Sequence, residues 1–209
     1  MKQKIFMAVI LLTAIFVAGC GLGTANDNDG LPTEEQLAAA KAELGEDMSE
    51  LKFSIDGVIF QYPMLVQDML DAGWYVDNSV KNELKTLEAN TRTTNFVLRK
   101  NADGEYGATE CSVVASNSGA SEVEIGETKL YNLNFRREKG SVLILPQGLD
   151  WDSTFEEVCD AYKPSQEQTA DMEGVLSIQF TNGSGDGHLT MWFDAETRKL
   201  SELKFFQAL

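Results

Sequence analysis

The chain has 209 residues and carries 33 aspartate and glutamate residues against 17 lysine and arginine residues, so its formal net charge at pH 7 is −16. This charge repels phosphate backbones and anionic membrane surfaces, which argues against nucleic-acid binding and against purely electrostatic membrane adhesion. The single histidine, His188, excludes metal sites built from histidine pairs, and no motif indicates a cofactor.

Residues 1–19 have the pattern of a secretion signal peptide. Lys2 and Lys4 precede an apolar run over 5–17, which is too short to span a bilayer comfortably as a permanent helix. Val17-Ala18-Gly19-Cys20 then resembles the lipobox of bacterial lipoproteins. The resemblance implies that diacylglycerol is attached to the Cys20 thiol and that the chain is cut before it. The mature protein would then be anchored on the outer, extracytoplasmic face of the cell membrane, in a Gram-positive cell. The alternative is a plain secretion signal followed by a chance cysteine.

Residues 20–50 are predicted to be an acidic tether that contains one short helix. Thr33 and Gln36 have capping-box spacing before a run of good helix formers. Only Leu37 and Leu44 in that helix are large and apolar. We therefore expect the helix to be mobile and to bury little surface.

Residues 51–209 are predicted to form an α+β ectodomain, and its first half, 51–140, is rich in short strands. Asp56-Gly57 supplies a tight turn for a hairpin over 53–62, and apolar residues at helical spacing follow at 65–70. Residues 142–145 are apolar on both faces, which predicts a central rather than an edge strand. Alternating apolar residues indicate further strands at 95–99, 106–115 and 131–135.

The second half, about 141–209, is predicted to place one helix against a three-stranded antiparallel meander. Ser153 and Glu156 have capping-box spacing at the start of an amphipathic helix over 155–162. Polar turns separate three strands at 175–181, 188–194 and 200–206. Alternation directs one set of side chains toward the helix: Ile178, Phe180, Leu189, Met191, Phe193, Leu203 and Phe205.

Short motifs in this second half resemble the repeat of the beta-lactamase-inhibitory-protein-like superfamily. They are Pro146-Gln-Gly148, Asp152-Ser-Thr-Phe-Glu-Glu-Val158, Ala161-Tyr162-Lys163-Pro164, and the strand from Leu189 to Asp194 with Leu200 after it. Lys163 stands where that superfamily usually has glycine. The resemblance implies a protein-binding scaffold without catalytic residues, made of short helices packed on antiparallel meander sheets. The segment 55–74 is similar to part of the uncharacterised surface lipoproteins of Gram-positive bacteria and reads as a degenerate copy of the same hairpin-and-helix unit.

The meander also has a predicted outward face on which aromatic and polar side chains alternate with the apolar set. Aromatic residues flanked by polar ones on a flat sheet have the composition of an interaction hot spot. The alternative is that Trp192 and Phe206 pack beneath the first-half helix or the middle strands. The predicted face consists of Gln179, His188, Thr190, Trp192, Lys204 and Phe206.

No catalytic set is predicted from the remaining chemistry-bearing residues. A Ser-His-Asp or Cys-His set would have to use His188, which falls on a strand and is expected to face solvent. Four acids cluster near the start of the second-half helix, where the helix dipole favours negative charge, and this explains them better than a general acid and base pair does. These acids are Asp150, Asp152, Glu156 and Glu157.

Cys111 and Cys159 leave two alternatives open. They pair as a disulfide in an exported domain, or each is a small buried apolar residue. The position of Cys159 on the apolar face of the predicted helix favours the second.

Taken together, these features predict a non-enzymatic binding or envelope-assembly module that is held at the membrane through Cys20. Its expected partner is an envelope or secreted protein. One alternative is a lipoprotein that captures a small ligand or peptide, and another is an envelope hydrolase with an unrecognised carboxylate pair. The hydrolase would need two facing carboxylates with raised pKa values in one pocket.

Overall fold

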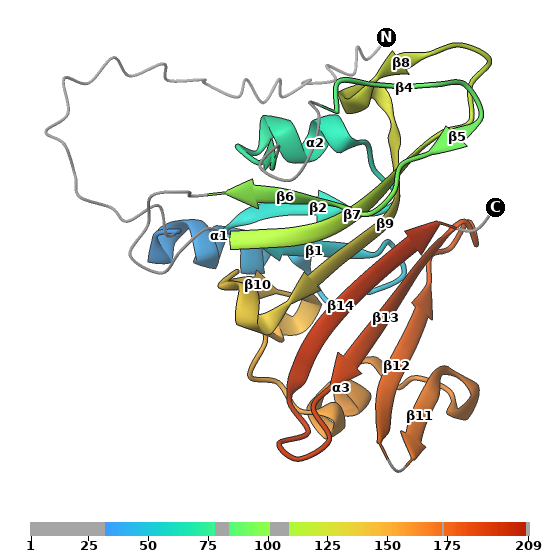
Figure 1. Cartoon of the computed structure of the whole chain (residues 1–209). Helices are drawn as coiled ribbons and strands as arrows, with labels where there is room; N and C mark the ends of the chain where they lie inside the picture. Colours follow the sequence, from blue (N-terminus) through green and yellow to red (C-terminus); the bar gives the residue numbers. More distant parts are fainter. Residues whose placement is uncertain (1–31, 78–83, 101–108, 173, 208–209) are drawn as a thin grey trace, which may run out of the picture.

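The computed structural model describes residues 32–77, 84–100, 109–172 and 174–207 (Figure 1). The fold is α+β and mostly β, as predicted. Its helices in this part of the chain are α1 (Glu34–Leu44), α2 (Val66–Asp71) and α3 (Phe155–Tyr162), with short 3-10 turns η1 (Ile125–Glu127), η2 (Arg137–Lys139), η3 (Pro146–Gly148) and η4 (Gln166–Gln168). Its strands are β1 (Lys52–Ile55), β2 (Val58–Gln61), β3 (Tyr75–Val76), β4 (Thr86–Leu87), β5 (Thr91–Arg92), β6 (Phe96–Lys100), β7 (Thr109–Asn117), β8 (Val123–Glu124), β9 (Lys129–Arg136), β10 (Leu143–Ile144), β11 (Thr169–Met172), β12 (Val175–Thr181), β13 (Gly187–Phe193) and β14 (Leu200–Gln207).

One large antiparallel sheet joins the two halves of the chain. Within the described residues its order is β11-β12-β13-β14-β9-β7-β6-β3, and β5 also pairs with β7. The two halves meet where β14 pairs with β9, with Leu203 opposite Phe135. The predicted strands over 175–181, 188–194 and 200–206 all form and pair in sequence order. The second half is therefore an extension of the same sheet.

The two halves have similar connections around their helices. In each half a short helix precedes a meander, and the residue before the helix forms an isolated antiparallel bridge with a residue at the start of the last strand, which is the first residue of β9 in one half and the residue just before β14 in the other. Leu65 bridges Lys129 in the first half, and Thr154 bridges Lys199 in the second. The first helical residue also makes a matching hydrogen bond in each half. The backbone N–H of Val66 donates to the carbonyl of the residue before Lys129 over 3.0 Å, and that of Phe155 donates to the carbonyl of the residue before Lys199 over 2.9 Å.

A small sheet of order β10-β1-β2 packs on the apolar face of the large sheet. Phe53 of β1 stacks on Phe205 of β14, with ring centroids 4.4 Å apart, and meets Phe135 of β9 edge-on. Asp56 and Gly57 turn the hairpin with φ values of 52° and 77°, as their sequence predicted. The aromatic contacts join the hairpin to both halves of the large sheet.

Three predictions of local structure need correction. The strand expected in the middle of the structure is buried, but β10 pairs only with β1 and so lies at an edge. The second-half helix is capped by Thr154 with Glu157, not by Ser153 with Glu156. Ser153 Oγ is used elsewhere, because it accepts the N–H of Asp150 at 2.9 Å.

The third correction concerns the predicted tether, because α1 belongs to the fold. Ala40 and Leu44 are buried against Ile144, and the partly buried Leu37 lies beside them. The backbone N–H of Gln147 also donates to the carbonyl of Gly45 over 2.8 Å. Small and large apolar residues on one side of α1 thus form the surface through which this helix packs on the rest of the fold. The capping box of Thr33 and Gln36 is present as predicted.

Candidate functional site: the open face of the large sheet

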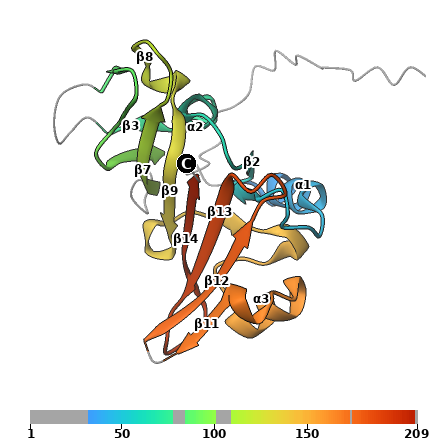
Figure 2. The same ribbon diagram turned by 90° about the vertical axis from the view of Figure 1, so that its right-hand side faces the viewer.

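The six residues predicted to share an outward face do lie on one face of the large sheet. Gln179 is opposite Thr190, and Thr190 is opposite Lys204. One row away, His188 is opposite Phe206. α3 packs on the other face, where Phe155 meets Phe193 and Tyr162 meets Phe180. Figure 2 shows α3 on that side of the strands. We call the side with the six residues the open face.

The aromatic side chains of the open face are not covered by the first half of the chain. Trp192 is 37% exposed, which contradicts the alternative that it is a core residue. Phe206 is half-buried, and the ring of His188 stacks on it with centroids 4.8 Å apart. Thr190 is buried at 4% exposure and lies between Gln179 and Lys204 of the neighbouring strands.

The contacts of His188 do not form a catalytic set. Its Nδ1 lies 3.0 Å from the hydroxyl of Thr181, and its ring face is covered by Phe206. Among the residues that the structure describes, no acid hydrogen-bonds to this imidazole. His188 therefore has the contacts of a surface strand residue.

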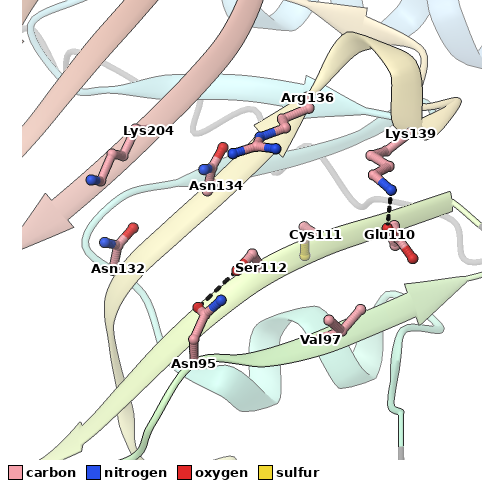
Figure 3. Close-up of a pocket in the computed structure, with 10 residues that line it drawn as sticks. All are labelled: Asn95, Val97, Glu110, Cys111, Ser112, Asn132, Asn134, Arg136, Lys139 and Lys204. Carbon is pink, nitrogen blue, oxygen red and sulfur yellow. Dashed lines mark hydrogen bonds and ion pairs between the residues drawn. The ribbon is translucent and has the colours of Figure 1, made fainter.

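A polar groove of about 440 Å³ continues the open face across β14, β9, β7 and β6 (Figure 3). It adjoins the predicted face at Lys204, which belongs to both. Sequence reasoning did not find this groove, because its residues come together only through the pairing of β9 with β14 and β7. The groove is lined by Asn95, Val97, Glu110, Cys111, Ser112, Asn132, Asn134, Arg136, Lys139 and Lys204.

Most charged groups at the rim of the groove are paired. Glu202 accepts the side-chain N–H of Asn134 at 2.8 Å and lies 3.5 Å from Arg136 Nε. Glu110 binds Lys139 at 2.5 Å and Arg99 at 3.4 Å. These contacts fix the rim and neutralise three of its cations.

Three polar groups of residues that line the groove have no partner among the described residues. Lys204 forms no ion pair there, and the side chain of Asn132 forms no hydrogen bond. Asn134 Oδ1 is buried and unbonded, although its amide nitrogen is used by Glu202. Buried polar atoms in native proteins normally have a partner, so Asn134 Oδ1 is an exception, but its burial withholds it from the surface of the groove.

The acids at the start of α3 are engaged as capping and ion-pairing groups. Asp152 lies 2.8 Å from Arg137 and 2.9 Å from Lys199, and hydrogen bonds to these two cations hold its pKa below the usual range. The hydrogen bond from Arg198 lowers the pKa of Glu156 in the same way. A hydrolase would need the opposite shift in one of a facing pair.

The two cysteines in the described part of the chain are free thiols. Cys111 is buried on β7, and Cys159 is half-buried on α3. Burial raises the pKa of both thiols, more strongly for Cys111. Raised pKa values make these thiols poor nucleophiles near neutral pH.

Cys20 and the predicted signal peptide lie outside the described residues. Within those residues, no helix is long and apolar enough to cross a membrane, and no group of three or more metal-binding side chains comes together. Searches with the whole chain find no matching family model, no matching curated protein and no matching solved structure.

Proposed function

We propose that this chain is a lipid-anchored, extracytoplasmic binding module that captures a protein partner on the open face of its large sheet. The observation that carries the proposal is the exposure of Trp192 beside a polar groove on a face that the helices leave uncovered. The superfamily resemblance of residues 141–209 points the same way. This resemblance remains a prediction, and so does the lipid anchor at Cys20.

The local chemistry around Trp192 suits an interaction hot spot. Trp192 is opposite Ser177 on one side and Glu202 on the other, so a large apolar ring stands among small and polar groups. Tryptophan contributes strongly to binding when a partner excludes water from it, and a polar surround assists that exclusion. The stacked pair of His188 and Phe206 adds a second aromatic surface nearby.

The open face is also preorganised. Its side chains stand on strands paired on both sides, so binding does not require the backbone to fold. Fewer degrees of freedom are then lost on association, which favours affinity. An anchor at Cys20 would add a high local concentration of the face at the membrane surface, so a modest affinity would suffice.

The partner can be identified by a photoreactive amino acid placed at position 179, which is exposed on the open face. Native envelopes would be irradiated, the cross-linked protein identified, and its affinity for the purified full-length chain measured. We expect Trp192→Ala to weaken that affinity at least about tenfold, the effect typical of a hot spot. Tyr75→Ala is the matched control, because Tyr75 is 40% exposed but lies on β3 at the far edge of the sheet. Equal losses in both variants would exclude the open face as the binding site.

The anchor has a separate test. Cells fed an alkyne-labelled fatty acid should incorporate the label into the wild-type chain and not into Cys20→Ser. Label retained in that variant would show that another residue is acylated, and no label in either chain would favour the plain secretion signal.

The polar groove favours a second candidate function, which is the capture of a small polar ligand or peptide without a folded partner. Its volume of about 440 Å³ is within the range of small-molecule sites, but its lining is far more polar than is usual for them. Cross-linking that yields no protein at position 179, together with ligand binding in the groove, would support this candidate over the first.

A further inference from the structure

We propose that α1 is a releasable strap, which leaves the small sheet while the large sheet stays folded. In the structure the strap is docked, and its release is argued from contacts of the described residues alone. What the release does for the protein rests on the proposed anchor at Cys20, because the chain from that residue enters the fold through α1.

The contact between α1 and the rest of the fold is small. Ala40 and Leu44 are buried against Ile144, and the partly buried Leu37 and Ile59 complete a cluster that is separate from the main core. The other residues of α1 are exposed. Among the described residues, its side-chain hydrogen bonds are confined to its own cap, and it forms no ion pair. Much less apolar burial therefore holds α1 in place than holds the strands of the core.

The helix is also too short to persist once it leaves the sheet. It has 11 residues, and isolated helices of fewer than about 12–15 residues are marginal in water. Its docked position is nevertheless specific, because Gly57 lets it approach closely: a Cβ there would lie 3.2 Å from the Cβ of Gln36. We therefore expect two discrete states, a docked helix and a released, unfolded segment.

A buried hydroxyl beneath α1 weakens its docking. Ser54 lies between Ile59 and Ile144 in the register of the small sheet, and cross-strand neighbours share a face, so its side chain is on the face that α1 covers. Ser54 is fully buried, and its Oγ has no hydrogen-bond partner. An unsatisfied buried hydroxyl costs free energy that water recovers when the helix leaves. Release is therefore easier than the apolar contacts alone would make it.

Gly45 marks the boundary of the strap. It ends α1 with a φ of 66°, and the space around its Cα is open, so the backbone can change direction there. Met48 and Leu51, which follow it, are buried in the main core. The backbone hydrogen bond from Gln147 to the Gly45 carbonyl lies at this boundary, so it can persist when α1 is released. The segment before Gly45 can thus open without loosening the segment after it.

Release would change the reach of an anchored module. As a helix, α1 is about 17 Å long, whereas residues 33–47 can span up to about 50 Å when extended. The chain between Cys20 and the core would gain about 30 Å from this difference. The strap would therefore let the open face meet a partner further from the membrane.

Amide hydrogen exchange of the full-length protein in detergent tests the release. The amides of residues 38–44 report on α1, and those of β9 and β14 report on the large sheet. We expect the α1 amides to exchange at least about 100-fold faster than the sheet amides, at a rate that depends little on low concentrations of urea. Ser54→Ala should slow the exchange of α1 at least about fivefold, because the buried hydroxyl is removed.

Ser141→Ala is the matched control for the serine substitution. Ser141 Oγ is also buried without a partner, but Ser141 is outside the cluster beneath α1. This control should leave the exchange of α1 as in wild type. α1 amides with the rate and urea dependence of the β9 amides would overturn the proposal. So would equal exchange of α1 in the two serine variants.

The gain in reach has its own measurement. The chain can be pulled by single-molecule force spectroscopy through handles at positions 24 and 207. A reversible lengthening of about 30 Å should precede the main unfolding event. The absence of this early step would refute the longer reach.

The outcome is separable from that of the proposed function, because neither measurement needs a partner or a lipid. If α1 exchanges only with the large sheet, the strap is refuted while the open face can still bind protein. If α1 is released but Trp192→Ala leaves the partner's affinity unchanged, the strap stands and the proposed binding face fails.

Discussion

The backbone N–H of Thr154 donates a hydrogen bond of 2.8 Å to the carboxylate of Glu157, three residues further along the chain. Leu65 and Asp68 make the same contact, also at 2.8 Å, at the start of α2. The two helices thus begin alike although their sequences differ, since only Thr154 has a hydroxyl to complete the capping box. The helix of the second half is therefore the better capped of the two.

This difference predicts the cost of losing the hydroxyl. Thr154→Ala should lower the free energy of unfolding by about 1 kcal/mol, because the N–H of Glu157 loses its acceptor. Urea unfolding followed by circular dichroism measures the change. Thr154→Ser keeps the hydroxyl and should unfold close to wild type. A serine variant as unstable as the alanine variant would point to the lost methyl group instead of the cap.

The two sides of the large sheet can be compared at adjacent phenylalanines. Phe205 is fully buried and stacks on Phe53, whereas Phe206 is half-buried on the open face. Phe205→Ala should cost about 3–5 kcal/mol, as is usual for a large buried ring. Phe206→Ala should cost no more than about 1 kcal/mol, in line with surface positions. Similar losses in the two variants would contradict the assigned faces.

Alternation along the chain was sufficient to predict the faces of β12, β13 and β14, because a strand repeats every two residues. The same rule would have placed the side chains of Asn132 and Asn134 on the outward face of the sheet and that of Leu133 on the inward face. It could not bring them beside Lys204, because strand pairing across many residues is set by tertiary packing. The groove was therefore not predictable from one sequence, although the outward direction of these two asparagine side chains was.

The errors at α1 and at the cap of α3 have different physical causes. α1 was expected to be mobile because large apolar residues are few, but Ala40 docks by being small and allows close approach to Ile144. At α3 two overlapping pairs share the capping-box spacing. Tertiary contacts decide between them. The carbonyl of Ser153 accepts the backbone N–H of Leu200, and its hydroxyl oxygen accepts the backbone N–H of Asp150.

The thiols give a third prediction. Alkylation of the folded protein at pH 8 should leave Cys111 unmodified and label Cys159 more slowly than in urea, because burial raises both pKa values. Mass spectrometry of the peptides measures each site, and the unfolded protein is the control for reagent access. Envelope-purified protein in which the two cysteines are joined would contradict the free thiols of the structure.

Asp56 gives the last prediction, on the pH dependence of stability. Its carboxyl accepts the N–H of Val142 at 2.8 Å, but Oδ2 is buried without a partner, and burial raises the pKa. The folded state then holds the proton more tightly than the unfolded state, so this group lowers stability as pH rises above 3.8, until the folded pKa is passed. Asp56→Asn keeps an acceptor for Val142 and tolerates the positive φ. Its gain in unfolding free energy over wild type should therefore be larger at pH 7 than at pH 3.5. The exposed Asp160→Asn controls for general charge removal, and a gain independent of pH would refute the burial argument.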